Sequence, residues 1–460
     1  MAITHERFGS KAANLAALSE VLPSINADDH LGVVGVPEFE AVPVTLFEQW
    51  RSGNVPDSDL KYLYERTREL GSKGVGAMIR SSAVLSEDGK HTTGAGVYDS
   101  VRLNPNVSFK TFVRKLEQVY LSTTSGKALS YMESLGINPA DERMGVILQT
   151  IPDSLSTHVT LDSVVAGMPG LALVRTNDLR LKKDTYHEPG GFRSGLKKTK
   201  LGTAVMDRAA VAGVDRVRFT AHPDSYADIF HIVPDRRKFT IPLSAVALTK
   251  LALQLEDYSC SPLQLEAGEA HFKTPEERQI HKAYTQLWLF QQRPIPEHMI
   301  AQKEFIGFPD NNTDLFRVCR GVGVMNGVIG NIGKGDLTTE TREVVREIQS
   351  LPIDEKYVML FDRSYGYADL SDKLTKKITS LTEDVRSKIV VMVTGYSGYS
   401  SHARNDGAHL ETMCLELGIP CVFYGDDLPS NDLIENYTYQ PERMYIYSNG
   451  YEARLFVGHT

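Results

Sequence analysis

A histidine lies in a glycine- and serine-rich loop near the C-terminal end of the chain, within Ser397-Gly398-Tyr399-Ser400-Ser401-His402-Ala403. The loop runs into a helical pattern that ends before Gly418-Ile419-Pro420. A helix N-terminus offers unpaired N–H groups and a positive dipole end to an anion, and imidazole is a nucleophile near neutral pH. The pattern therefore predicts that His402 carries a phosphoryl group, the alternative being a loop whose histidine is purely structural.

Side chains that could hold the phosphates of a nucleotide lie far apart in the first two thirds of the chain. Lysine and arginine neutralise phosphate charge, small loop residues let backbone N–H groups approach it, and Mg²⁺ requires oxygen ligands. No Gly-x-x-x-x-Gly-Lys-Ser/Thr loop and no Gly-x-Gly-x-x-Gly turn occurs, so a nucleotide site would use another scaffold. Taken singly, each candidate also suits an ordinary role as a solvated residue or an ion-pair partner. The candidates are Lys11, Arg80, the loop from Thr92 to Gly96, Glu266, Gln291 and Arg293.

Length and composition limit the classes of protein to consider. The chain has 460 residues, which predicts two or three domains, and its formal net charge of −8 is spread without a basic stripe, which argues against a dedicated nucleic-acid surface. The four cysteines form no Cys-x-x-Cys pair, so neither a zinc site nor a disulfide framework is predicted. No apolar stretch approaches the roughly 18 residues of a membrane span and no signal core is evident, so we expect a soluble cytoplasmic protein.

Hydrophobic periodicity and breaker residues predict the elements that must position these side chains. A short strand over 76–80 is expected to deliver Arg80 at its end, and the region 150–240 is predicted to be sheet and loops of unknown order. The other predicted elements of this part are helices over 10–21, from 45, over 57–72, 108–135 and 243–256, and strands over 33–36, 39–42 and 144–149.

The pattern changes after Arg293-Pro294-Ile295-Pro296, and the rest of the chain alternates strand and helix. We therefore expect an α/β (α+β) protein with a domain over 1–300, a linker over 301–315 and a smaller α/β domain over 316–460. In the second domain, strands are predicted over 357–361, 389–393, 421–424, 443–447 and 453–457, and helices over 369–386 and up to 417.

Six short segments follow one another along the first domain. They are Gly9 to Leu15, Arg80-Ser81-Ser82-Ala83 with Glu87-Asp88, Ala95-Gly96, Val146 to Gln149, Pro262 to Glu266, and Phe290 to Ile295. In type and order they resemble the ATP-binding domain of the phosphoenolpyruvate synthase and pyruvate phosphate dikinase family, which includes rifampin phosphotransferase and is related to ATP-grasp enzymes. The resemblance covers about residues 5–298 and implies an ATP-grasp-like nucleotide-binding domain.

The resemblance also implies a role for each matching residue. Gln149 would lie beside the adenine. The spacing of 25 residues from Glu266 to Gln291 is longer than the family's, so a hairpin insertion is implied and Glu277 remains a rival for the acidic ligand. The other implied roles are phosphate contact for Lys11, Arg80 and Arg293, phosphate covering for Thr92, Thr93, Gly94, Ala95 and Gly96, and Mg²⁺ binding for Glu266 and Gln291.

The C-terminal domain resembles the family's swivelling phosphohistidine domain. Gly398-Tyr399-Ser400-Ser401-His402-Ala403 is similar to the family's Gly-x-Thr-Ser-His-Ala, and Leu415 to Pro420 to its Arg-Glu-Leu-Gly-Ile-Pro. The family's histidine lies closer to that proline, however, at the position of His409 here. A lengthened loop favours His409 and the local motif favours His402, so both remain candidate carriers, His402 the first choice.

The implied function is a dikinase-type phosphotransferase that uses ATP and Mg²⁺. The β-phosphoryl group would pass to the histidine and then to an acceptor, with AMP and phosphate released overall. The family's large acceptor domains have no room in this chain, so the acceptor would be a small molecule or a domain of another protein. The alternatives are a catalytically altered nucleotide-binding or regulatory protein, and an ATP-grasp ligase, which would make ADP and need no phosphohistidine domain.

Overall fold

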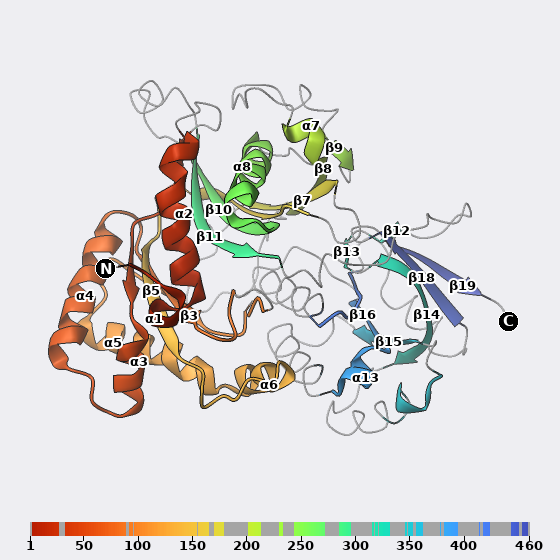
Figure 1. The fold of residues 1–460 in the computed structure, drawn as a ribbon, viewed down its shortest axis with the longest axis horizontal. Helices are drawn as coiled ribbons and strands as arrows, with labels where there is room; N and C mark the ends of the chain where they lie inside the picture. The colour runs from red at the N-terminus through yellow and green to blue at the C-terminus, as the bar shows by residue number, and fades with distance from the viewer. Residues whose placement is uncertain are drawn as a thin grey trace, which may run out of the picture. The chain divides into compact units, whose positions relative to one another are not determined.

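The computed structural model describes most of the first 295 residues and the strands of the remainder. The described residues are 2–26, 33–88, 92–94, 96–153, 155–164, 170–178, 201–212, 230–232, 243–271, 285–295, 315–316, 318–320, 322–331, 346, 348–352, 356–361, 378, 381–393, 414, 417–423, 443–449 and 453–458. The chain divides into two compact units, one of Met1–Val164 and Gly170–Ile295 and the other of Val165–Pro169 and Pro296–Thr460 (Figure 1). The mixture of helices and sheets fits the predicted α/β class.

An antiparallel four-stranded sheet and its helices form the first part of unit 1. Three helices cover one face of this sheet because apolar side chains recur on one side of each, among them Phe47, Leu70 and Phe112, and these pack on Ile79 and Leu148. The strands, in spatial order, are β2 (Phe39–Val42), β5 (Met144–Thr150), β3 (Ala77–Ala83) and β4 (Ser100–Leu103). The helices are α3 (Val44–Arg51), α4 (Asp57–Ser72) and α5 (Phe109–Leu121), with α6 (Gly126–Ser134) after them.

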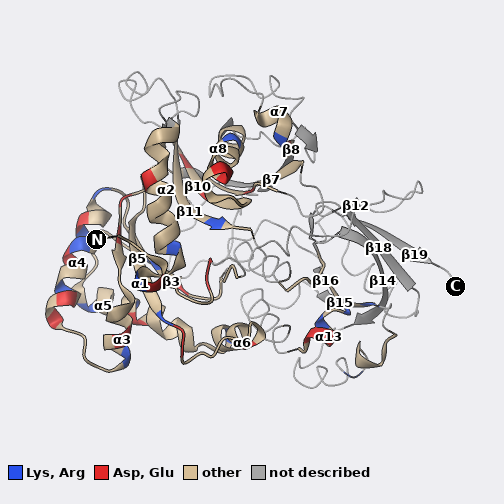
Figure 2. Cartoon of the chain, viewed as in Figure 1, with Lys and Arg blue, Asp and Glu red and all other residues tan. Residues whose placement is uncertain are grey.

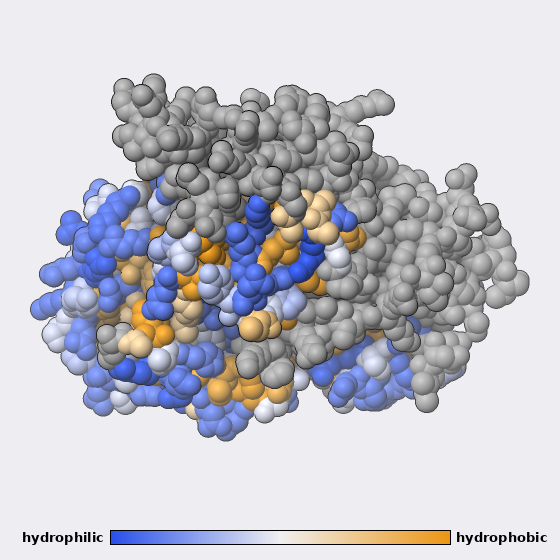
Figure 3. All heavy atoms as spheres, turned by 45° about the horizontal axis from the view of Figure 1, so that its top comes forward, coloured by the Kyte–Doolittle hydropathy of each residue, from blue (hydrophilic) through white to orange (hydrophobic). Residues whose placement is uncertain are grey.

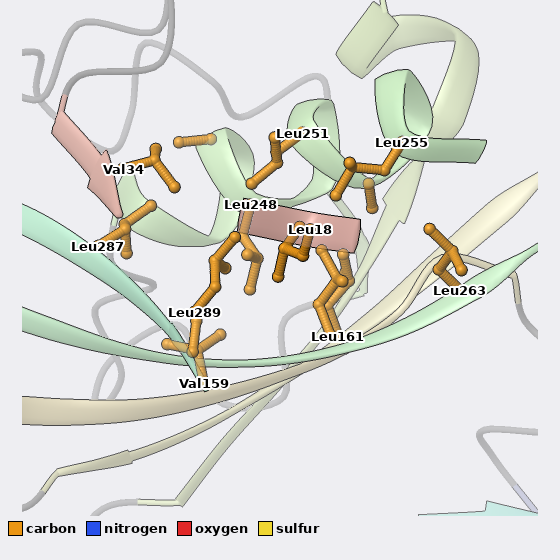
Figure 4. Packing of buried hydrophobic residues seen from close by; sticks show 14 of the residues in the cluster. Leu18, Val34, Val159, Leu161, Leu248, Leu251, Leu255, Leu263, Leu287 and Leu289 are labelled. Atoms are coloured by element: carbon orange, nitrogen blue, oxygen red, sulfur yellow. The ribbon is translucent and has the colours of Figure 1, made fainter. Parts of the chain in front are cut away.

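A seven-stranded sheet forms the second part of unit 1. Its strands, in spatial order, are β1 (Val33–Gly35), β11 (Thr285–Pro294), β10 (Leu263–His271), β6 (Leu155–Asp162), β7 (Leu171–Asp178), β8 (Leu201–Asp207) and β9 (Phe230–Ile232). Helices α2 (Ser10–Asn26) and α8 (Leu243–Ser259) pack on it, and Figure 4 shows Leu18 and Leu251 from these helices above Leu161, Leu263 and Leu289 of the strands. Because side chains alternate along a strand, the opposite face carries the polar residues of β6 and β10.

Most predicted elements of unit 1 are confirmed, with three corrections. Strand β3 (Ala77–Ala83) places Arg80 at its middle rather than its end. The predicted helix over 108–135 is two helices, because the chain forms a 3₁₀ turn at Ser122–Thr124 and Ser125 caps α6 by accepting from the Ala128 N–H. Helix α2 continues past residue 21 to Asn26.

The described part of unit 2 is an eight-stranded sheet with a short helix, α13 (Glu383–Arg386). Strands β14 to β17 follow one another in space as parallel neighbours, and the predicted strands of this region are confirmed. Residues 397–409, which include both candidate histidines, lie outside the described residues. The strands, in spatial order, are β12 (Leu315–Phe316), β19 (Ala453–Gly458), β18 (Arg443–Asn449), β14 (Val322–Asn331), β15 (Lys356–Phe361), β16 (Ile389–Val393), β17 (Cys421–Phe423) and β13 (Val318–Arg320).

On the face that Figure 3 shows, the described residues are largely hydrophilic, with hydrophobic ones in separate areas among them. Within the ranges described above, no helix combines the length and the apolar character that crossing a membrane requires.

Basic and acidic residues are interspersed along α4, as Figure 2 shows, and Arg66 ties this helix to Glu40 of β2 at 3.3 Å. Arg66 bonds Glu38 at 2.9 Å and Glu69 at 2.6 Å, and Lys73 bonds Glu69 at 2.9 Å. Hydrogen bonds from Arg66 and then Lys73 lower the pKa of Glu69 from 4.5 to about 2. A carboxyl group whose pKa is lower in the folded than in the unfolded protein stabilises the fold at pH values above its unfolded-state pKa. This stabilisation is lost as the pH falls through the folded-state pKa.

Glu69→Gln is therefore expected to lower the melting temperature only slightly at pH 7, by about 1–2 °C, because the Glu69 side chain is exposed. The difference from wild type should narrow below pH 4.5 and vanish near pH 2. Thermal unfolding followed by circular dichroism across this pH range checks the prediction, and a difference that grew on acidification would contradict it.

Candidate nucleotide-phosphate site

Lys11 lies in the first turn of α2, at the junction of the two sheets of unit 1. Its ammonium forms a short ion pair with Glu87, whose carboxylate also accepts from Ser81 Oγ and the Ala83 N–H, both at 2.9 Å. The side chains of Lys11 and Glu87 are 11% and 1% exposed, so Lys11 is not the solvated helix residue that its position alone suggests. Gly9 permits this packing because the helix start lies directly on the backbone of Ser82.

Arg80 joins the two sheets. From the middle of β3 it donates through Nη1 to Gln149 Oε1 at 3.0 Å and to the Phe290 carbonyl at 2.6 Å, and through Nη2 to Gln291 Oε1 at 2.6 Å. Gln149 lies on the neighbouring strand β5, where Met78 is its cross-strand partner. The same face of the four-stranded sheet therefore presents Arg80 and Gln149 to the seven-stranded sheet.

Two cross-strand rows line the opposing face of the seven-stranded sheet. In one row Gln264 is paired with both Asp162 and Arg293, and in the next Glu266 is paired with Gln291. Gln264 accepts from Arg293 Nε and donates to Asp162 Oδ1, while Arg293 Nη2 lies 3.3 Å from Glu266 Oε1. Adjacent strands thus hold an arginine, a carboxylate and an amide next to one another.

A β-bulge at Phe290 makes this arrangement possible. Glu266 is paired with Gln291, but the next residue, Ala267, is paired with Leu289, so Phe290 has no partner on β10. The carbonyl of Phe290 consequently accepts from Arg80 instead of joining the ladder. The bulge also turns Gln291 towards the site while Leu289 remains in the hydrophobic core.

Asp88 reaches the same point from the loop after β3. Its Oδ2 accepts from Gln291 Nε2 at 2.5 Å, and its Oδ1 lies 3.5 Å from Arg293 Nη1. Its N–H donates to the Thr93 carbonyl at 3.2 Å, which holds the candidate covering loop against it. Gly94 has a φ of +56° and donates to Tyr131 Oη at 3.0 Å.

Glu142 fixes the intervening loop. Its buried carboxylate accepts from the N–H groups of Val84 at 3.1 Å and of Leu85 and Ser86 at 3.0 Å, and it bonds the Ser86 hydroxyl. Successive backbone N–H groups of this kind form a nest that binds an anion. Here the chain's own carboxylate fills the nest, so these amides position the segment that carries Glu87 and Asp88.

Charge and burial act in opposite directions on the two carboxyls that Arg293 contacts. Burial raises the pKa of Asp88 to about 6, against the opposing charges of Lys11 and Arg293. Partial burial also acts to raise the pKa of Glu266, but the charges of Arg293 and Arg80 outweigh it and hold this pKa at about 2. Glu266 is therefore the more firmly ionised of the two.

The donor chemistry of the site suits a hard divalent cation. Glu266, Gln291 and Asp88 offer carboxylate and amide oxygens, and Asp88 Oδ1 has no hydrogen-bond donor among the described residues. Among the described residues, no three His, Cys, Asp or Glu side chains gather closely enough to hold a metal. Arg293 lies between the two carboxylates, 3.5 Å from Asp88 and 3.3 Å from Glu266. The residues fit Mg²⁺ by type, and binding would require the arginines to shift.

The structure thus brings together five of the residues singled out from the sequence, namely Arg80, Gln149, Glu266, Gln291 and Arg293. Lys11 lies close enough for its charge to act on Glu266. Gln149 contacts Arg80, and Thr93, Gly94 and Gly96 follow Asp88 in the chain. Ala95, His402, His409 and the rival ligand Glu277 lie outside the described residues. Asp162 and Glu142 were missed because neither belongs to a recognisable motif, although Glu142 lies directly before a buried strand.

In this arrangement, cations from separate elements face oxygen donors across the two sheets of unit 1. Residues 52–167 match the family model of the AMP/ATP-binding domain of pyruvate phosphate dikinase. This match relates the chain to an ATP/AMP-binding phosphotransferase family at the level of one domain. A comparison with curated proteins finds no match.

Proposed function

We propose that this chain is an ATP-dependent phosphotransferase of the dikinase type. The observation that supports it most is the convergence of Arg80 and Arg293, from two distant segments, on the donors Glu266 and Gln291, with Lys11 close enough for its charge to act on Glu266. The matched AMP/ATP-binding domain supports the same proposal, because residues 52–167 include Arg80 and the loop that ends in Gly96. The sequence resemblance adds the histidine domain and thus the dikinase stoichiometry.

The basic residues would bind the phosphoryl oxygens of ATP. Phosphoryl transfer depends on positioning and on stabilising charge that spreads over these oxygens, and a planar guanidinium contacts two of them at once. Glu266 and Gln291 would hold Mg²⁺, which supplies further charge neutralisation when bound. Gln264 accepts a hydrogen bond from Arg293 and the Phe290 carbonyl accepts one from Arg80, so both guanidinium groups are held at the site before they turn to the phosphates.

In the first half-reaction a neutral imidazole nitrogen of His402 or His409 would attack the β-phosphorus of ATP. The bond from this phosphorus to the AMP oxygen would break, AMP would leave, and a pyrophosphoryl group would remain on the nitrogen until water removes its terminal phosphate. Phosphate is released in the overall reaction, and the second half-reaction passes the phosphoryl group from nitrogen to an acceptor. The acceptor is a small molecule or a domain of another protein. A purely regulatory nucleotide-binding protein is the second candidate, which the departures Ser10 and Gln264 from the family motifs favour.

The test incubates the full chain with ATP and Mg²⁺ and separates AMP from ADP by chromatography. Intact mass of wild type, His402→Ala, His409→Ala and the double variant locates acid-labile phosphate. We expect AMP as a product. We also expect wild type to carry the acid-labile phosphate and one of the two single variants to lack it. Label that persists in the double variant would refute the phosphohistidine step, ADP as the sole product would refute the dikinase stoichiometry, and ATP binding without AMP would support the regulatory alternative.

Arg80→Lys is expected to reduce AMP formation by about 10²-fold, because lysine keeps the charge but loses the planar fork that reaches both sheets. Arg102→Lys is the matched control, since Arg102 is exposed on the neighbouring strand β4. AMP formation by both variants, with ATP affinity from calorimetry, checks the prediction. Equal activity of Arg80→Lys and wild type would remove Arg80 from the phosphate site.

A further inference from the structure

Asp88 adopts a backbone conformation that few side chains tolerate. Its φ is +46°, a region that favours glycine, asparagine and aspartate, and its side chain is buried with 3% of the residue exposed. Two hydrogen bonds hold it there, from its N–H to the Thr93 carbonyl at 3.2 Å and from Asn14 Nδ2 to its own carbonyl at 3.3 Å. A costly conformation that is fixed from both sides is a feature of functional sites.

The side chain of Asp88 points at the opposing sheet but is only partly satisfied there. Gln291 Nε2 donates to Oδ2 at 2.5 Å, whereas Oδ1 receives no hydrogen bond from any described residue and has only the ion pair with Arg293 at 3.5 Å. An ionised carboxylate in a buried site usually accepts several hydrogen bonds. Asp88 therefore keeps one oxygen available to a ligand.

Arg80 and Arg293 contact three oxygen-bearing side chains near Asp88 Oδ1, including that of Asp88 itself. Arg293 lies 3.5 Å from Asp88 and 3.3 Å from Glu266, and Arg80 donates to Gln291 at 2.6 Å and lies 3.9 Å from Glu266. If these guanidinium groups turn to the phosphates of a nucleotide, both carboxylates lose their counter-charge. A divalent cation would restore it, and such cations prefer oxygen donors of this kind.

We propose that Asp88 is a third protein ligand of the divalent cation, binding through Oδ1 beside Glu266 and Gln291. The inference rests on the proposed function, which places the cation at the latter two residues. It assigns to the loop after β3 a role beyond phosphate covering, because the cation would tie this loop to strands β10 and β11. Lys11 does not need Asp88 as a partner, since Glu87 already pairs with it.

The test measures Mn²⁺ binding to the full chain by electron paramagnetic resonance of free Mn²⁺, with and without a non-hydrolysable ATP analogue. Asp88→Asn preserves size and suits a positive φ, and Asp88→Gly relieves the backbone, so at least one variant should stay folded. We expect both variants to bind Mn²⁺ at least about tenfold more weakly. The exposed carboxylate variant Asp99→Asn should bind like wild type.

Glu266→Gln separates this inference from the proposed function. If Glu266→Gln weakens Mn²⁺ binding and folded Asp88→Asn or Asp88→Gly does not, Asp88 is not a ligand and the inference is overturned. If the analogue fails to bind wild type, the proposed function fails instead. Thermal unfolding of each variant, with and without Mn²⁺, provides a second readout, because a lost ligand removes the metal-dependent rise in melting temperature.

Discussion

Gly9→Ala is expected to destabilise unit 1 by about 3–5 kcal/mol, or about 10 °C in melting temperature. A Cβ atom at this position would lie 1.8 Å from the carbonyl oxygen of Ser82, which belongs to the central strand β3 and cannot move aside. Gly9 also has φ 80° and ψ 168°, a conformation that is essentially restricted to glycine. Both effects displace the start of α2 and with it Lys11, so nucleotide binding should fall as well.

Two other glycine variants separate the steric and conformational parts of this effect. Gly53→Ala tests conformation alone, since Gly53 has a φ of +72° and a Cβ added there would meet no atom within 4 Å. Gly145→Ala tests the clash alone, since its Cβ would lie 2.2 Å from the Phe8 carbonyl oxygen and its φ is not positive. Chemical denaturation of the three variants should rank Gly9→Ala as the least stable. A Gly9→Ala protein as stable as Gly53→Ala would contradict the packing described here.

Lys11→Met is expected to cost about 3–5 kcal/mol, because it leaves the carboxylate of Glu87 buried without a counter-charge. The double variant Lys11→Met/Glu87→Gln should recover most of this loss, since an amide at position 87 can still bond Ser81 and the Ala83 N–H. Nucleotide binding should not recover, because the phosphate contact proposed for Lys11 is absent from both variants.

Denaturant unfolding and calorimetric titration with ATP and Mg²⁺ measure these two roles of Lys11 independently. Lys73→Met is the matched control. Lys73 directly follows α4 and forms exposed ion pairs with Glu38 and Glu69, so its loss should change neither quantity much. ATP binding by the double variant at the wild-type level would show that Lys11 serves the fold alone. Lys11→Met that unfolds like wild type would instead show that the ion pair contributes little.

The sequence was most informative where one strand or helix carries one side chain of the right chemistry. Helix α4 (Asp57–Ser72) has the predicted bounds because Pro56 precedes it and an apolar face recurs along it. Lys11, Arg80 and Arg293 could be selected because the short motifs that contain them follow one another in the order of the ATP-binding domain that the chain resembles. That these residues approach one another could be expected only from the order of the motifs. Segments as far apart as residues 11 and 293 are brought together by tertiary packing, which no local sequence pattern records.

Other features depended on contacts that the sequence does not display. Glu142 satisfies three successive N–H groups across 56 to 58 residues, and no nearby pattern marks it. Asp88 belongs to one of the matching segments, yet its positive φ and its hydrogen bond with Gln291 follow from tertiary packing. The strand order of residues 150–240 could not be read because Thr, Val and Gly recur there without a period that identifies partners.

The bulge at Phe290 makes the length of β11 as important as its composition. Leu287, Leu289, Gln291 and Arg293 are all odd-numbered, yet the first two lie in the core and the last two in the site. The alternation of side chains between the two faces of β11 shifts by one residue at Phe290, the residue inserted by the bulge. Adding or deleting a single residue between Leu289 and Gln291 would therefore exchange the apolar and polar faces along part of the strand. The hydrophobic core and the candidate site thus both require this segment to keep its present length.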